Sequence, residues 1–296
     1  MNEVKGQEVR TSNMGPGADA RYLTYGRLNG RFEYNKNIYH GKWERYSDGT
    51  SRLVKYVEPR VKPSALLSSS NSGNDGFVEN DEDYAERYEQ GVQQRIYKIK
   101  NVLRGYIRNN DFDHFWTITF DPKEVGTDNL VRYQAMEKWL GKERKKAKRQ
   151  GLDFRYIFVP EYHTGKGGNR GTIHWHGVTG GYLPKLTDSG KNYKGVKVYN
   201  CDTWELGFTN VQKVRSKTKV ASYVMKYITK NLVTSPVGKG KKRYWASNNL
   251  ISPEKMYLMK NLEIGRVANA TFDHCEIYEL TKEETEKIMK EEERND

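Results

Sequence analysis

The sequence is poor in the residues and segments that mark several common protein classes. Cys201 and Cys275 are its only cysteines, too few for a disulfide framework or a cysteine-rich zinc module. No apolar run approaches the roughly 20 residues that a transmembrane helix needs, and the first residues lack the apolar segment of a secretory signal. No glycine-rich loop carries the Gly-Lys-Ser/Thr triplet of a P-loop. These absences disfavour a secreted, membrane-bound or ATP-hydrolysing protein, and we expect a cytoplasmic one.

Positive charge is what the sequence has in excess. Lysine and arginine outnumber aspartate and glutamate by 51 to 38, which gives a formal net charge of +13. Such a charge favours a polyanionic partner, with nucleic acid ahead of a membrane surface. Tyrosines are also numerous, with 21 in the chain. Some of these rings could stack on unpaired bases, although most tyrosines fill half-buried positions in sheets.

Composition divides the chain into four segments, which cover residues 1–61, 62–83, 84–235 and 236–296. The first has the turn pairs Asn29-Gly30 and Asp48-Gly49 between basic, aromatic runs, which predicts hairpins and a possible DNA-binding region. The second is rich in serine, glycine, asparagine and acidic residues, which predicts a linker or long loop. The third is the expected main domain. The fourth is an extension whose acidic end predicts a helix with a capping box, Thr281 to Glu284.

Hydrophobic spacing predicts the elements of the main domain. Apolar residues three or four apart predict helices over residues 84–109, 128–150 and 218–232. Alternating residues predict strands over residues 114–120, 154–163, 172–180 and 207–214. The second and third of these strands form a hairpin, and the polar stretch at 183–206 predicts a loop.

Two histidines one residue apart lie within one predicted strand, "TIHWHGVTG". Because side chains alternate along a strand, His174 and His176 share a face and could hold a metal ion. Glu161 on the hairpin partner can supply a third ligand, and His163 is its rival. Two imidazoles and a carboxylate leave positions open for water and substrate, and such ligands tolerate Mg²⁺, Mn²⁺ or Zn²⁺. Packed histidines, zinc hydratases and cupin-type barrels show the same spacing, so the pair alone does not identify a reaction.

A second cluster of polar residues lies in "SYVMKYITK", within the predicted helix at 218–232. Tyr223 and Tyr227 are four residues apart and would share a helix face, with Lys226 and Lys230 beside them. A tyrosine hydroxyl is a poor nucleophile near neutral pH because its pKa is about 10. Nearby positive charge or a metal ion on the attacked phosphate reduces that obstacle. Such spacing is nevertheless more often that of an amphipathic core helix.

Together these stretches resemble the rolling-circle replication initiators of the HUH endonuclease superfamily. "FWTITF" at 115–120 is similar to the first family motif, "IHWHG" at 173–177 to the second, and "YVMKYITK" at 223–230 to the third. The third is of the two-tyrosine type found in initiators of small single-stranded DNA phages and some plasmids. The resemblance covers residues 95–235.

The resemblance implies an α+β fold, a central antiparallel sheet flanked by helices, with a ferredoxin-like or RRM-like core and N- and C-terminal extensions. It implies a metal-dependent nuclease that holds Mg²⁺ or Mn²⁺ with His174, His176 and Glu161. Tyr223 and Tyr227 would attack origin DNA in turn, assisted by Lys226 and Lys230. Each attack would leave a 5′-phosphotyrosine link and a free 3′-OH primer. Single-stranded and origin DNA, a host helicase and the replication machinery are the implied partners.

Three alternatives stay open at this point. A non-enzymatic basic DNA-binding protein would use packed histidines and base-stacking tyrosines, without a covalent product. A mobilisation relaxase or transposase of the same superfamily would share the chemistry. The tyrosines follow the histidines here, whereas relaxases carry the nucleophile ahead of them, which favours an initiator. A metal hydrolase of small molecules is disfavoured by the net charge of +13.

Overall fold

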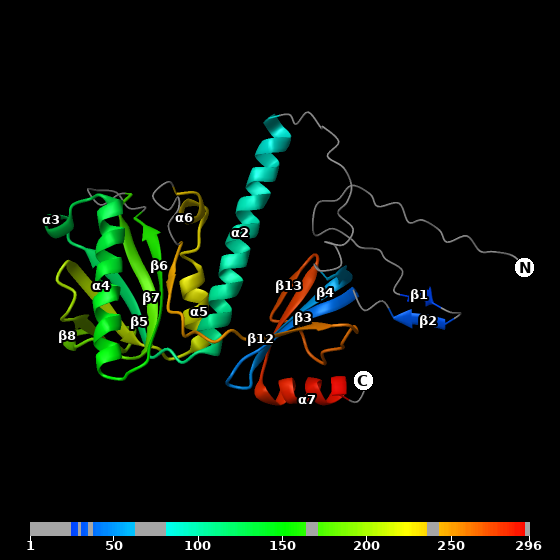
Figure 1. Ribbon diagram of the computed structural model, residues 1–296. Helices are drawn as coiled ribbons and strands as arrows, with labels where there is room; N and C mark the ends of the chain where they lie inside the picture. Colours follow the sequence, from blue (N-terminus) through cyan, green and yellow to red (C-terminus); the bar gives the residue numbers. More distant parts are fainter. Residues whose placement is uncertain are drawn as a thin grey trace, which may run out of the picture. The chain divides into compact units, whose positions relative to one another are not determined.

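A computed structural model of the chain describes residues 25–28, 31–34, 38–62, 81–163, 171–235 and 243–293. The chain forms two compact units, one of Met1–Phe77 with Pro253–Asp296 and the other of Val78–Ser252. Each unit contains an antiparallel sheet flanked by one or more helices (Figure 1). The predicted α+β class is therefore confirmed. No helix in the described ranges is both long enough and apolar enough to cross a membrane.

The larger unit is built on a seven-stranded antiparallel sheet. In order across the sheet, its strands are β11 (Trp245–Ala246), β6 (Phe154–Tyr162), β7 (Ile173–Gly181), β5 (His114–Phe120), β10 (Gly207–Lys213), β9 (Val196–Cys201) and β8 (Leu186–Tyr193). The four strands predicted from alternation, β5, β6, β7 and β10, are confirmed and lie side by side. Side chains on β7 therefore have neighbours on both β6 and β5.

Helices cover both faces of this sheet (Figure 1). They are α4 (Asn129–Arg149) on one face, α2 (Asp81–Asn109), α5 (Lys217–Met225) and α6 (Lys230–Thr234) on the other, and the single turn α3 (Pro122–Val125) after β5. The N-cap of α4 is Asp128, whose carboxylate accepts a hydrogen bond from the amide of Leu130. The helices predicted over 84–109 and 128–150 are confirmed.

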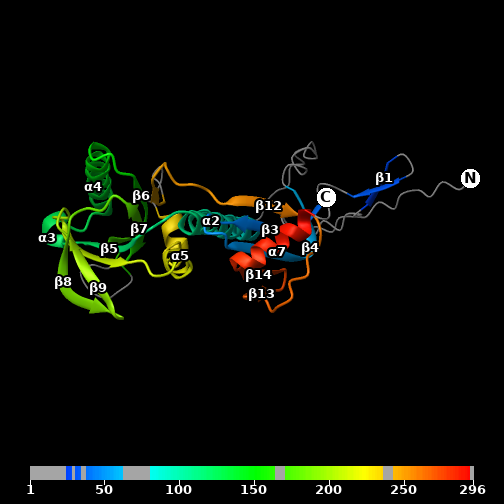
Figure 2. The ribbon, with the colours of Figure 1, turned by 90° about the horizontal axis from the view of Figure 1, so that it is seen from below.

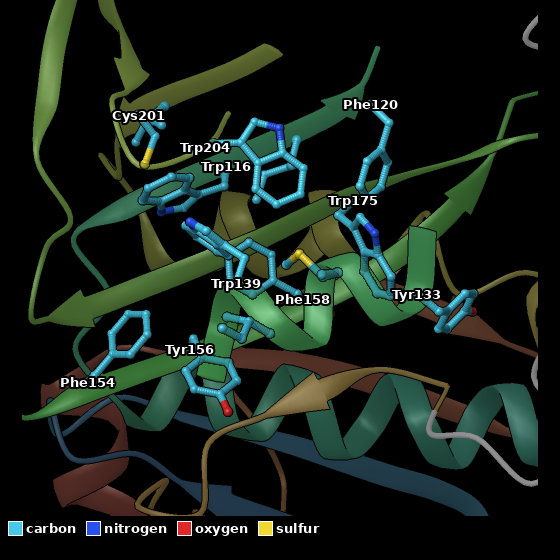
Figure 3. Packing of buried hydrophobic residues seen from close by; sticks show 14 of the residues in the cluster. Trp116, Phe120, Tyr133, Trp139, Phe154, Tyr156, Phe158, Trp175, Cys201 and Trp204 are labelled. Carbon is cyan, nitrogen blue, oxygen red and sulfur yellow. The ribbon is translucent and has the colours of Figure 1, made fainter. Parts of the chain in front are cut away.

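The face under α4 carries an aromatic core (Figure 3). Trp116, Trp139 and Phe158 are almost completely buried, and their ring centroids lie 5.9–6.3 Å apart in tilted or edge-to-face pairs. Trp175 of β7 points into the same core. Because neighbours on a strand alternate, His174 and His176 on either side of it point to the opposite face, toward α2 and α5.

Gly177 of β7 allows the Phe158 ring to pack against the strand. A Cβ at this position would lie 2.3 Å from a ring carbon of Phe158 and 2.4 Å from the carbonyl oxygen of Ile157. We expect Gly177→Ala to lower the free energy of unfolding by about 1–3 kcal/mol, because the core is overpacked. Gly91→Ala in α2 is the matched control, since its Cβ meets nothing within 4 Å. It should stabilise the helix by roughly 0.5–1 kcal/mol. Equal effects of the two changes in urea denaturation would contradict this explanation.

Two predictions about the larger unit are wrong. Residues 183–206, predicted as a loop, contain the hairpin of β8 and β9. The helix predicted over 218–232 is broken, because α5 ends at Met225 and α6 begins only at Lys230. Between them the amides of Lys226, Tyr227 and Ile228 bond to carbonyls three residues back, as in a 3₁₀ turn. Thr229 then caps α6, its hydroxyl accepting a hydrogen bond from the amide of Leu232.

The smaller unit holds a five-stranded antiparallel sheet. Its strands, in order, are β12 (Glu254–Leu258), β3 (Ile38–Arg45), β4 (Ser51–Val61), β14 (Cys275–Leu280) and β13 (Ala270–Phe272). α7 (Lys282–Glu293) follows β14, and its predicted capping box is confirmed by hydrogen bonds between Thr281 and Glu284. Segments 1–61 and 236–296, treated as separate extensions in the sequence, thus contribute strands to one sheet.

The predicted hairpins of residues 20–60 are confirmed. β3 and β4 pair around Asp48-Gly49, and β1 (Tyr25–Leu28) pairs with β2 (Arg31–Tyr34). The linker predicted at 62–83 falls almost entirely outside the described residues, apart from its two ends.

Candidate metal centre and tyrosine pair

Strand register brings the predicted metal ligands together. Glu161 on β6 lies directly opposite His174 on β7, and His176 follows two residues later on the same face. One carboxylate oxygen of Glu161 lies 2.7 Å from Nε2 of His174 and 2.9 Å from Nε2 of His176. One ligand atom from each of the three residues lies within 4.8 Å of the other two. The two strands thus hold a possible metal-binding triad.

The second ring nitrogen of each histidine has its own partner. Nδ1 of His176 lies 3.2 Å from the hydroxyl of Thr117 on β5, and Nδ1 of His174 lies 3.0 Å from Nε2 of His163. A proton held on Nδ1 by such a partner leaves the lone pair of Nε2 free for a cation. His163, considered as a third ligand from sequence, contacts the far side of His174 instead.

The electrostatics of the triad suit a cation. Burial, together with His176 and His163, lowers the pKa of His174 to about 4. Burial alone would raise the pKa of Glu161, but its hydrogen bonds and charge interactions with His176 and His174 outweigh burial and lower it. Near neutral pH, His174 is therefore neutral and Glu161 ionised. Two nitrogen donors and one anionic oxygen fit Mn²⁺ or Zn²⁺, and Mg²⁺ where water completes the shell.

Both tyrosines lie beside this triad. The ring of Tyr227 stacks flat on His176, with centroids 3.7 Å apart and an angle of 4° between the planes. Tyr223 meets the ring of Tyr227 edge-on at 5.3 Å and that of Phe115 at 5.1 Å. Because the helix is broken between them, Tyr227 reaches the sheet rather than lying one α-helical turn above Tyr223.

The two phenols differ in their surroundings. Tyr223 is 41% exposed, whereas Tyr227 is 8% exposed. Burial and then a hydrogen bond with Tyr223 raise the pKa of Tyr227 well above its usual value. Tyr223 is accordingly the phenol that solvent and a substrate can reach in this conformation.

The two lysines are separated by the helix break. Nζ of Lys226 lies 5.4 Å from the ring centroid of Tyr223. Lys230 instead forms an ion pair with Glu89 of α2. The expectation that both ammonium groups face the tyrosines depended on a continuous helix, so only Lys226 retains that geometry.

Sequence reasoning missed Thr117 and Phe115, which lie inside the strand "HFWTITF". Alternation places both on one face of β5, which was a usable signal. That this face is the histidine face follows only from the register, in which Thr117 is opposite His176. Neither residue type suggests metal or nucleophile chemistry by itself.

The fold and the site define an α+β protein in which a possible metal triad on adjacent strands lies beside two tyrosines. Residues 113–232, from β5 to α6, match a family model of replication-associated proteins of the ORF2 type. The matched region contains the triad and both tyrosines, and the match supports a Rep-type replication initiation protein. Comparison with curated proteins and with solved structures gave no match.

Thr117 offers a test of how the triad is held. We expect Thr117→Val to weaken Mn²⁺ binding about 10–100-fold, because His176 loses the partner of its Nδ1. Thr119→Val is the matched control, as it lies two residues along the same face of β5 and has no bond to a triad residue. Isothermal titration calorimetry of both variants measures the difference. Equal Mn²⁺ affinities would mean that Thr117 does not orient His176.

Proposed function

We propose that this protein initiates rolling-circle replication by nicking one DNA strand at an origin through tyrosine attack. The observation that carries the proposal is the contact of both tyrosines with the triad, since Tyr227 stacks on His176 and Tyr223 lies 6.3 Å from that ring. The match to replication-associated proteins and the net charge of +13 support it. Recruitment of a host helicase and of the replication machinery would follow the nick.

In the proposed reaction, the hydroxyl oxygen of Tyr223 attacks a backbone phosphorus. An O–P bond to tyrosine forms, the P–O3′ bond breaks, the phenol proton passes to a base, and the departing 3′ oxygen is protonated. A divalent cation on His174, His176 and Glu161 supplies charge stabilisation to the phosphate when bound. Lys226 adds positive charge beside the attacking ring.

Tyr227 fits the second step of the same cycle. Its hydroxyl has a raised pKa and its ring covers His176, so it is poorly placed to attack first. After one round of synthesis, Tyr227 would leave the histidine and cleave the regenerated junction. The released 3′-OH then attacks the first phosphotyrosine, which rejoins the strand and frees Tyr223. The transesterifications conserve the number of phosphodiester bonds and need no nucleotide cofactor.

The test is a labelled-strand assay with the full chain. Single-stranded origin fragments are incubated with Mg²⁺ or Mn²⁺, labelled in one reaction at the 3′ end and in another at the 5′ end. The 3′ label should migrate with the protein after denaturation, and the 5′ label should appear on a shorter product that a polymerase extends. Salt-dependent binding without any covalent band would instead indicate a non-enzymatic DNA-binding protein.

A further inference from the structure

The sheet of the smaller unit has two unlike faces. α7 lies across one of them (Figure 2), where Ile288 packs with Trp43, Leu53 and Tyr278. The opposite face carries rings and cations on β3, β4 and β12 and none of the helices in the described residues. We call it the aromatic-basic face, and its members are Tyr39, Lys42, Tyr56, Arg60, Lys62 and Tyr257.

Cations on this face lie over aromatic rings. Nζ of Lys42 is 5.6 Å from the centroid of Tyr39 and 5.7 Å from that of Tyr257. The guanidinium of Arg60 lies 4.1 Å from the Tyr56 ring, and Lys62 completes the set at 5.8 Å from Tyr257. These positive groups are close enough to disfavour one another: burial, Arg60 and Lys255 lower the pKa of Lys42. An anion on this face would relieve that repulsion.

Acidic residues on the same face do not neutralise this cluster. Glu44 forms an ion pair with Lys255 at 3.4 Å, and Glu279 pairs with Arg52 at 3.3 Å. Strand pairing places each carboxylate opposite a basic residue of a neighbouring strand. Lys42, Arg60 and Lys62 form no ion pair within the described part of the chain, so they add net positive charge to the face.

Two exposed rings flank the cations. Tyr257 on the edge strand β12 is 41% exposed and lies opposite Lys42. Phe272 on the other edge strand, β13, is 51% exposed, and the register Phe272 to Cys275 to Tyr56 puts it on the same face. Exposed rings beside phosphate-binding cations are how proteins hold unpaired nucleotides, because every base has a face that stacks.

We propose that the aromatic-basic face binds single-stranded DNA, with Tyr257 and Phe272 stacking on bases and Lys42, Arg60 and Lys62 contacting phosphates. The face lies outside residues 113–232, so it is a second DNA contact beyond the proposed nicking site. Phosphates answer the unpaired positive charge, and bases answer the exposed rings. A duplex would offer the phosphates but bury its base faces, and therefore uses only half of the surface.

The first experiment measures binding of the full chain to a fluorescent oligothymidylate by anisotropy. EDTA is present, so that any metal-dependent cleavage is prevented. We expect Tyr257→Ala with Phe272→Ala to bind roughly 5- to 100-fold more weakly, the range for lost base stacking. The control is Tyr88→Ala with Tyr97→Ala, which removes two exposed rings from α2. It should change affinity less than twofold.

The cations are tested through salt dependence. Each phosphate contact on a single strand contributes about 0.7 to the slope of log affinity against log salt. Arg60→Gln with Lys62→Gln should therefore reduce the magnitude of that slope by about 1.4. Lys287→Gln with Lys290→Gln on the exposed side of α7 is the matched control, which keeps the net charge equal.

Photocrosslinking of the unmodified protein covers the case in which a variant fails to fold. A 5-bromodeoxyuridine oligonucleotide should crosslink to peptides that contain Tyr257 or Phe272. Crosslinks confined to residues 113–232, unchanged affinity of both variant pairs, equal binding of a duplex, or preference for phosphatidylserine vesicles over DNA would each overturn the proposal. The labelled-strand assay tests nicking separately, and adduct formation should survive Tyr257→Ala with Phe272→Ala.

Discussion

Tyr223→Phe should abolish the first covalent DNA adduct, with single-turnover formation slowed by at least on the order of a thousandfold, or about 4 kcal/mol. The change removes only the hydroxyl oxygen that is proposed to bond to phosphorus. The ring keeps its contacts with Phe115 and Tyr227, so folding and DNA affinity should be unaffected. Quenched-flow assays of adduct formation, with anisotropy for DNA affinity, separate chemistry from binding.

Tyr227→Phe is the matched comparison, because it removes the same atom from the neighbouring ring. Its ring can still stack on His176, and the exposed Tyr223 hydroxyl is retained, so the first nick should proceed within a fewfold of the normal rate. The second cleavage, measured on a substrate with two joined origins, should fail. The change also removes the phenol whose hydrogen bond with Tyr223 is indicated in the structure.

The double variant Tyr223→Phe with Tyr227→Phe excludes substitution of one nucleophile for the other. It should form no adduct at all while binding DNA normally. An unchanged adduct yield from the double variant would sink the assignment of both tyrosines. A first nick lost in Tyr227→Phe but kept in Tyr223→Phe would reverse their proposed order, and would require the stacked ring to leave His176 before the first reaction.

Local patterns predicted the central strands because each is buried on both faces or alternates clearly. β8 and β9 escaped because their pairing leaves little buried surface: "LTDSGKNY" has no fully buried residue. Their turn was also unrecognised, since Lys194 and Gly195 both adopt positive φ, at 49° and 72°. A two-residue turn of this kind usually has asparagine or aspartate before glycine. The sheet of the smaller unit joins residues about 200 positions apart, which no local pattern encodes.

The site could be predicted where strand geometry alone determines it. Alternation put His174 and His176 on one face, and the hairpin put Glu161 opposite them. Helical spacing misled for Tyr227, because it is compatible with an unbroken helix. The cap at Thr229 restarts the helix and lets the preceding residues tighten. Competition between a side-chain cap and helix continuation is decided by packing on the sheet, which the sequence does not display.

His174→Ala with His176→Ala should eliminate strand cleavage in Mg²⁺ and in Mn²⁺ alike, a loss on the order of a thousandfold or about 4 kcal/mol. Two of the three proposed donor atoms disappear, and Glu161 alone would not retain a cation against water. Mn²⁺ binding measured by electron paramagnetic resonance should be lost together with cleavage. His114→Ala, in the same sheet but outside the triad, is the control and should keep both.

Single changes then separate the third ligand from its rival. Glu161→Gln keeps the shape of the side chain but removes the anionic oxygen that lies 2.7 Å and 2.9 Å from the two histidines, so it should weaken Mn²⁺ binding most. His163→Ala removes only the partner of His174 Nδ1 and should cost about 10–100-fold. The reverse ranking would make His163 the ligand and Glu161 its support. Cleavage that survives the double histidine change would show that the pair is structural.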